Sequence, residues 1–416
     1  MAPALCLLLV LVLAPGDTTE SRPAPLIVPG RPSPADTTRV DPKARAREEY
    51  LRGRELERLN ADGPAIVSYA LALRHDPDIP DANYRIGLLE LKSSSLMSAT
   101  RAFAAELKRH PDNLDAAREL GLALARLGRH DSAVRRLEAL VKRAPQDGRN
   151  WRALGFAQLL AGQPQAAESA LRRAIALPPP SALEHRDLGY VLAQTGREAE
   201  ARAEYRKAIA MDPKETGAWV NLANLARKDG DLAQALTDFR EAEKRDSTLA
   251  LAVSGQALVL RQLGRDEEAA ATYRRLLDLD PTDRASRFDA IQLFDSLGRG
   301  DIALQLARDG VRAEPGSGAA RLLLGLELQG RGRTREAVLE LRRAHALLAD
   351  EEGRARAERL IANLRAQAPA TLRAQLDADS VAFERERTRA ARARPLAKPS
   401  LGTPDSTSAP ALPDSR

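Results

Sequence analysis

Cysteine is nearly absent from this sequence. The one cysteine, Cys6, lies near the start of an N-terminal apolar run and directly follows Leu5. A lipidated cysteine would instead follow such a run, with a small residue before it, so we do not expect lipidation. Beyond Cys6 the chain has no thiol, which excludes disulfide bonds, thiolate metal sites and a cysteine nucleophile there.

Aromatic residues are scarce as well, and neither sign of charge is in large excess. Aromatics make up 3% of the chain, the formal net charge is +6, and the isoelectric point is about 9.6. The abundant residues are alanine, leucine and arginine, which favour helices. The mild positive charge is compatible with acidic partners but does not by itself indicate a nucleic-acid binder.

Residues that often carry catalysis or bind metals show no grouping in the sequence. No two of the histidines have the spacing of a metal-binding pair on one helix. The five are His75, His110, His130, His185 and His345. The glycines follow a repeat and form no phosphate-binding loop. We therefore predict no enzyme activity, no catalytic residues, no metal site and no cofactor.

The N-terminus has features of an export signal. An apolar run from Ala4 to Ala14 is too short to span a bilayer but fits the apolar region of a secretory signal, and Gly16 supplies a small residue for cleavage. The run lacks a preceding Lys or Arg. We predict a signal peptide over 1–16 and an exported, periplasmic or membrane-associated protein. The alternatives are an uncleaved signal anchor, or a misassigned start and a cytoplasmic protein.

Two residue types recur every 34 residues along most of the chain. Alanine occupies one position of this register nine times without exception: Ala65, Ala99, Ala133, Ala167, Ala201, Ala235, Ala269, Ala303 and Ala337. Proline occupies another: Pro77, Pro111, Pro145, Pro179, Pro213, Pro281 and Pro315. Such a period indicates a stack of identical supersecondary units. We number each unit 1 to 34, so that Ala46 is position 1 of the first repeat.

The other recurring positions describe a helical hairpin. Positions 4, 7, 8 and 11 form one stripe on a first helix, and position 15 is glycine in seven repeats, which suits a left-handed helix end. A second helix buries positions 20, 24 and 27. Small residues at 8 and 20 allow close approach, while a bulky residue at 24 fills the space beside them. Proline at position 32 ends the second helix.

The pattern resembles the tetratricopeptide repeat family, most fully at Trp151-Arg-Ala-Leu-Gly-Phe-Ala-Gln158 and Trp219-Val-Asn-Leu-Ala223. The resemblance implies an all-α, right-handed superhelical solenoid of nine repeats whose units share a continuous core. The expected repeats are 46–79, 80–113, 114–147, 148–181, 182–215, 216–249, 250–283, 284–317 and 318–351.

The segments outside the repeats differ in composition. Residues 17–44 are rich in Pro, Thr, Ser and Arg and are expected to form a disordered linker, as is the tail over 395–416. Residues 352–394 are expected to form a capping helix and a further C-terminal helix. The cap would bury an apolar face made of Ala357, Leu360, Ile361 and Leu364.

In tetratricopeptide proteins the concave groove is lined by the first helices, at positions 2, 5, 9 and 12. Positions 5 and 9 of repeats two to five predict a partner-binding surface. Its residues are Tyr84, Arg118, Arg152, Phe156, Arg186 and Tyr190. Three arginines one repeat apart would repel each other unless acidic groups lie against them, which favours an acidic peptide ligand. The alternative is that Glu119 and Asp187 form surface salt bridges with them.

The resemblance implies a non-enzymatic scaffold that binds proteins or peptides. The family's clamp for a C-terminal carboxylate is not expected, because Tyr190, Leu251 and Gly255 stand where its polar residues would be needed. RNA binding is not expected either, because arginines occupy the groove position in only three of nine repeats. The sequence predicts no membrane contact except through an uncleaved anchor, and it does not predict an oligomeric state.

Overall fold

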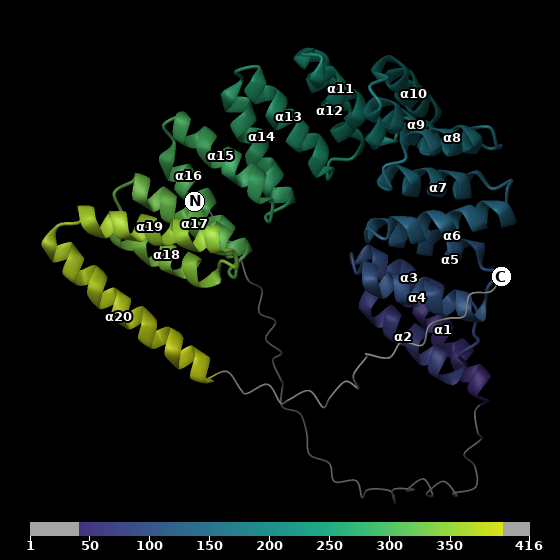
Figure 1. Cartoon of the computed structure of the whole chain (residues 1–416), viewed down its shortest axis with the longest axis horizontal. Helices are drawn as coiled ribbons and strands as arrows, with labels where there is room; N and C mark the ends of the chain where they lie inside the picture. Colours follow the sequence, from purple (N-terminus) through teal and green to yellow (C-terminus); the bar gives the residue numbers. More distant parts are fainter. Residues whose placement is uncertain (1–40, 394–416) are drawn as a thin grey trace, which may run out of the picture.

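The computed structural model describes residues 41–393, and its regular elements there are twenty α-helices arranged in an open arc (Figure 1). The predicted signal peptide (1–16), nearly all of the predicted linker and the predicted tail (395–416) lie outside the described residues. The all-α solenoid expected from the sequence is confirmed. None of the helices within 41–393 combines the length and apolarity needed to cross a bilayer.

Nine helical hairpins follow one another along the chain. Their first helices are α1 (Pro42–Arg58), α3 (Ala82–Lys92), α5 (Leu114–Arg126), α7 (Gly148–Leu160), α9 (Ala182–Gln194), α11 (Thr216–Lys228), α13 (Ala250–Gln262), α15 (Arg284–Ser296) and α17 (Gly318–Gly330). Their second helices are α2 (Asp62–His75), α4 (Leu96–Arg109), α6 (His130–Arg143), α8 (Pro164–Ile175), α10 (Glu198–Met211), α12 (Leu232–Arg245), α14 (Asp266–Leu279), α16 (Gly300–Ala313) and α18 (Thr334–Leu347).

The recurring residues have the roles that the sequence predicts. Each alanine at position 20 is completely buried, from Ala65 in α2 to Ala337 in α18. The glycines at position 15 have φ between 68° and 84°, a left-handed conformation that costs glycine little. Most second helices end two residues before the proline at position 32. Side chains at position 24, such as Tyr205, are buried against position 8.

Contacts between alternate helices show which side of the arc each set of helices lines. First helices touch the first helices of the next repeat, as in α5 with α7, α7 with α9, α9 with α11 and α11 with α13. Because neighbours on the inside of a curved stack lie closer together, the first helices line the concave side. The groove residues predicted from the sequence belong to these helices.

Helix α1 begins earlier than the first repeat of the sequence register. It starts at Pro42, within the stretch 17–44 that was expected to be linker. Asp41 precedes it, and its carboxylate accepts a hydrogen bond from Lys43 N at 3.1 Å. Asp as the N-cap and Pro at the first helical position are both favourable, so the helix extends back to them.

Two helices follow the ninth repeat. Helix α19 (Glu351–Gln367) buries Ala357 and Leu364, while Leu360 and Ile361 pack against the same core cluster as the last repeats. Helix α20 (Ala370–Ala393) contacts α18 and buries Leu376 before it projects from the end of the solenoid (Figure 1). These helices cover apolar surface that the ninth repeat would otherwise expose.

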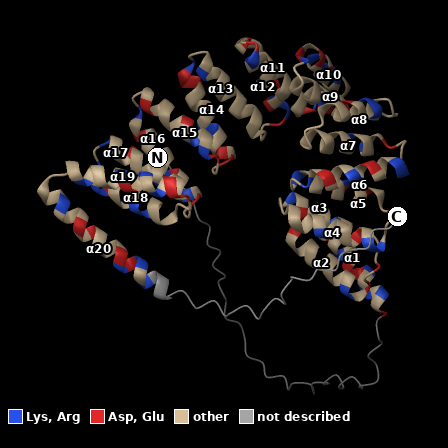
Figure 2. Cartoon of the chain, in the orientation of Figure 1, with Lys and Arg blue, Asp and Glu red and all other residues tan. Residues whose placement is uncertain are grey.

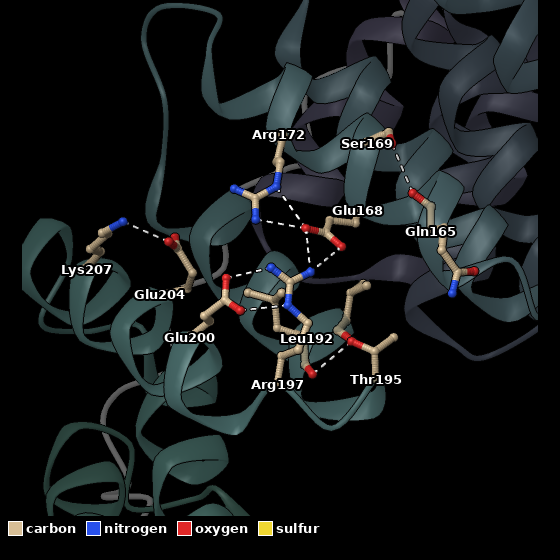
Figure 3. A network of polar contacts seen from close by, with 11 residues as sticks. Gln165, Glu168, Ser169, Arg172, Leu192, Thr195, Arg197, Glu200, Glu204 and Lys207 are labelled. Carbon is tan, nitrogen blue, oxygen red and sulfur yellow. Dashed lines mark hydrogen bonds and ion pairs between the residues drawn. The ribbon is translucent and has the colours of Figure 1, made fainter.

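Ion pairs join successive repeats on their polar surfaces. Arg197, just after the turn between α9 and α10, bonds Glu168 of the preceding repeat at 2.8 Å and Glu200 of its own at 2.6 Å (Figure 3). Arg172 bonds Glu168 as well, at 2.8 Å. Basic and acidic residues are interspersed along the arc and do not segregate to separate ends (Figure 2).

Candidate functional site in the concave groove

The six residues predicted to bind a partner all lie on first helices of repeats two to five. Tyr84 is on α3, Arg118 on α5, Arg152 and Phe156 on α7, and Arg186 and Tyr190 on α9. The structure therefore places them along one side of the solenoid. Their surroundings differ, however, and the difference decides which of them are open to a ligand.

Arg118 is held by the chain's own acidic and amide groups. It is 9% exposed, it pairs with Asp115 on its own helix, and its Nη1 donates to Asn150 Oδ1 at 3.3 Å. Glu119 and Asp147 lie 3.8 and 3.9 Å away. Burial raises the pKa of Glu119 above its usual range, although Arg118 and other nearby cations act in the opposite direction.

Arg152 and Arg186 share one carboxylate. Asp187 lies 3.3 Å from Arg152 Nη1 and accepts from Arg186 Nη2 at 2.7 Å. Arg186 also bonds Glu215 at 3.0 Å, and Arg152 lies 3.8 Å from Glu184. Alternating charges therefore connect α7 to α9, and α9 to the residue that caps α11. The repulsion between arginines is relieved within the chain, through Asp187 as the sequence allowed, and no acidic ligand is needed for it.

The aromatic residues of the predicted site divide into packed and open ones. Tyr84 is half-buried, with its ring centroid 5.9 Å from that of Phe103, and burial raises its pKa. Phe156 is also half-buried and packs against a core cluster that spans repeats two to four. Tyr190, by contrast, is 44% exposed although its neighbours on the helix are buried.

An apolar hollow of about 380 Å³ opens beside Tyr190. It lies between the first helices of repeats four to seven. Its lining includes Phe156, Leu159, Leu160, Tyr190, Val220, Asn221, Leu249 and Leu251, with Arg186 and Asp187 also on its wall. Three of these apolar side chains are well exposed: Leu160 at 40%, Tyr190 at 44% and Leu251 at 68%. Large exposed apolar side chains grouped in a hollow are typical of interaction sites.

A family model matches the sequence of the repeats described above. The tetratricopeptide repeat family model matches residues 84–148, 127–182, 154–216 and 220–284, which include the helices of the hollow. The chain is a tetratricopeptide-repeat protein. Members of this family are generally non-catalytic scaffolds that bind proteins or peptides. No curated protein matches the sequence of this tetratricopeptide-repeat protein.

Several solved structures resemble this tetratricopeptide-repeat protein over part of its length. MamA from Desulfovibrio magneticus RS-1 is 22% identical, covering 41% of this chain and 97% of its own, with a TM-score of 0.38. PilF of Pseudomonas aeruginosa is 19% identical over an alignment that covers 51% of this chain and 96% of PilF, with a TM-score of 0.40. One chain of the APC/C hetero-tetramer Cut9–Hcn1 is 15% identical over an alignment that covers 77% of this chain and 76% of that chain, with a TM-score of 0.42.

Most of the lining of the hollow in this tetratricopeptide-repeat protein was not predicted as a binding surface, including its exposed leucines Leu160 and Leu251. Leu251 stands at position 2 of its repeat and Leu160 at position 13, whereas the predicted binding surface was taken from positions 5 and 9 alone. The signal in the sequence was a leucine on the inward side of a first helix, at a position to which the repeat pattern assigns no packing partner. Of the six predicted residues, Phe156, Arg186 and Tyr190 line this hollow, and Tyr84, Arg118 and Arg152 do not.

Proposed function

We propose that this protein is a non-enzymatic scaffold that captures a partner protein in its concave groove, with the hollow around Tyr190 and Leu251 receiving an apolar side chain of the partner. The observation that carries the proposal is the grouping of exposed apolar side chains in a hollow of about 380 Å³ on the concave side. Burying such side chains against a partner is favourable, because apolar surface leaves water on both molecules.

The polar groups on the wall of this hollow suit an orienting role. Arg186 and Asp187 are bonded to each other and to neighbouring carboxylates and guanidinium groups, so they present no unpaired charge. Asn221 lines the same hollow and its side-chain amide can donate and accept hydrogen bonds. We infer that the apolar contacts supply most of the affinity here and that the polar wall selects the orientation.

Site-specific photocrosslinking tests this proposal in the protein's own cells. A photoreactive phenylalanine analogue replaces Tyr190 in one strain and Met97 in another. Met97 is 55% exposed but lies on the second helix α4. We expect a discrete crosslinked partner from position 190 and none from position 97. Leu251→Ser should abolish the crosslink, while Met97→Ser should leave it unchanged. Equal crosslinking from both positions would refute a role for the groove.

We further propose that the protein acts after export, in the bacterial envelope. The support is the apolar run from Ala4 to Ala14 with Gly16 after it. N-terminal sequencing of the native protein tests this. A mature protein that starts at Asp17 supports cleavage and export, whereas an intact hydrophobic start in the membrane fraction supports an anchor. Recovery from the cytoplasm would instead favour the alternative, a cytoplasmic adaptor.

A further inference from the structure

A second apolar hollow, of about 270 Å³, lies between repeats eight and nine and the capping helix. Its apolar lining is formed by Phe288 on α15 and by Leu322, Leu323 and Leu326 on α17. Phe288 is 46% exposed. The hollow shares no residue with the one at Tyr190, so conclusions about the two are independent.

The charges around this second hollow are unequal. Three arginines and one carboxylate line it: Arg284, Arg287, Arg356 and Glu314. Arg284 and Glu314 form a bidentate ion pair, in which Nε and Nη2 of the arginine donate to the two carboxylate oxygens at 2.6 and 2.7 Å, so their charges neutralise each other. Two guanidinium groups therefore remain at the wall without a carboxylate in the lining to balance them.

Arg287 is one of these two, and it is buried. It is 5% exposed, and its guanidinium donates to the carbonyl oxygens of Leu306, at 3.0 Å, and Pro281, at 2.5 Å. Within residues 41–393 no carboxylate approaches to salt-bridge distance, although Asp309, Asp283 and Glu314 act on it from further away. Burial lowers its pKa below the ordinary arginine value, the mark of a cation whose charge is poorly compensated.

Arg287 stands at position 4 of its repeat and makes a backbone contact that this position also makes in other repeats. Position 4 is tryptophan in repeats four and six, where Trp151 and Trp219 donate to the carbonyl six residues earlier, at 2.9 and 3.4 Å. Arg287 makes the equivalent bond to Pro281. Its side chain lies over Gly310, where a Cβ would come within 2.7 Å of Arg287 Cδ.

The second arginine without a partner in the lining is Arg356. It is exposed on α19, and among the described residues it makes no ion pair. Its guanidinium can therefore turn toward a ligand without breaking an existing contact. An anion placed in the hollow would lie in the field of Arg356 and of the buried Arg287, in a site whose apolar walls weaken screening by water.

We propose that this second hollow is a docking site for an acidic–apolar peptide motif. A leucine or phenylalanine side chain of the partner enters between Phe288, Leu322 and Leu326, and a neighbouring Asp or Glu carboxylate accepts hydrogen bonds from Arg356. Leu258 on α13, in the repeat before Phe288, is also 39% exposed. A peptide bound along the groove would pass the hollow as an internal segment, which favours a side-chain carboxylate over a chain-terminal one.

Fluorine NMR of the full chain tests the proposal. Phe288→4-fluorophenylalanine places a reporter in the hollow with little change in shape. The titrants are four-residue peptides blocked at both ends that contain Phe-Glu, Phe-Gln or Ala-Glu, together with a free-acid peptide ending in Phe. We expect the Phe-Glu peptide to saturate the shift at a concentration about five- to tenfold lower than Phe-Gln, because a charged acceptor strengthens the bond to Arg356. The Ala-Glu peptide should not saturate it.

Matched variants distinguish the effect of the charge of Arg356 on peptide binding from an effect on the fold. Arg356→Gln should remove the preference for Phe-Glu over Phe-Gln, whereas Arg359→Gln, an exposed change on the same helix, should preserve it. Ala319→Phe, at an exposed lining position, should fill the hollow and abolish binding of every peptide. Equal affinity for Phe-Glu and Phe-Gln, an equal effect of both arginine variants, or tightest binding by the free-acid peptide would overturn the proposal.

Discussion

A Cβ atom on Gly87 would lie 2.4 Å from Cε1 of Phe103, in space that the aromatic ring already fills. The same relationship recurs at positions 8 and 24 of other repeats, as between Gly189 and Tyr205. Repeat eight reverses it: Ile291 stands at position 8 and Ala307 at position 24, and each is 1% exposed. The two positions therefore complement each other in volume.

This complementarity predicts the outcome of a double-mutant cycle. Gly87→Ile alone should destabilise the protein by about 3 kcal/mol through overpacking, and Phe103→Ala alone by about 3–5 kcal/mol through the cavity it leaves. The double variant reproduces the pair of repeat eight and should be more stable than either single variant. Urea unfolding followed by circular dichroism measures this. Additive losses would show that the two side chains do not compete for one space.

Removing the carboxylate of Glu106 should destabilise the second repeat. Glu106 is completely buried on α4, and it accepts hydrogen bonds from the backbone N–H groups of Asp81 at 3.1 Å and Tyr84 at 3.3 Å, at the start of α3. Asp81 has φ 63° and its own side chain does not cap the helix. We expect Glu106→Ala to cost about 1–3 kcal/mol, because buried donors lose their acceptor. Urea unfolding measures the loss, and the exposed change Glu138→Ala should leave the midpoint unchanged.

Acid should weaken the joint between repeats four and five. Burial alone would raise the pKa of Glu168, but hydrogen bonds from Arg172 and Arg197 outweigh it and lower the pKa below 4.5 (Figure 3). The unfolded chain therefore takes up this proton first as the pH falls. The stabilisation is complete above about pH 4.5 and is lost as the pH falls through the lower pKa of the folded state.

Hydrogen exchange in α8 and α9 between pH 3 and 6 measures this loss, with Glu168→Gln as the comparison. Protection should fall more steeply in the wild type below about pH 4.5, and the two proteins should converge at the lowest pH. Added salt should reduce the difference, since the pair is partly open to solvent. Parallel curves over the whole range would contradict the role of Glu168.

Arg186→Ala should weaken the solenoid itself. Arg186 ties Asp187 on α9 to Glu215, whose carboxylate accepts from Gly217 N at 3.0 Å at the start of α11. Its loss leaves the half-buried Glu215 without this ion pair and Asp187 with Arg152 as its remaining cation, and we expect a cost of about 1–2 kcal/mol. Hydrogen exchange should locate the change in α9 and α11. Arg173→Ala, exposed on α8, should have no such effect. Unchanged stability with lost partner binding would instead make Arg186 a ligand-binding residue.

The packing of the repeats was predictable because it follows the register. Positions 8, 15, 20 and 32 have one dominant residue type each, position 24 is bulky in eight of the nine repeats, and each of the five has one physical use in a helical hairpin. Ala201, for example, is buried because only a small side chain fits where the two helices cross. These features depend on neighbours within one repeat, which the sequence presents together.

Which groove side chains are open to a ligand was less predictable, because that depends on ion pairs and hydrogen bonds between residues of different repeats. Asp187 was foreseeable as a partner of the arginines, but its bonds to both Arg152 and Arg186 depend on rotamers that the register does not determine. The capping role of Glu106 was not foreseeable, since position 27 is small or apolar in the other repeats. Likewise, Arg287 packs over Gly310, which lies 23 residues further along the chain, in space that a Cβ atom would otherwise need.

The constant 34-residue spacing makes the groove extendable in whole units. Each repeat contacts mainly its neighbours, and the connections α12–α13 and α14–α15 are both four residues long, so excision of residues 250–283 would leave a connection of that same length. That change would remove Leu251 from the lining of the hollow at Tyr190, together with Leu258, and would bring the rest of that hollow one repeat nearer to the hollow at Phe288. If one partner occupies both hollows, the number of hairpins sets the separation that its two anchoring side chains must have.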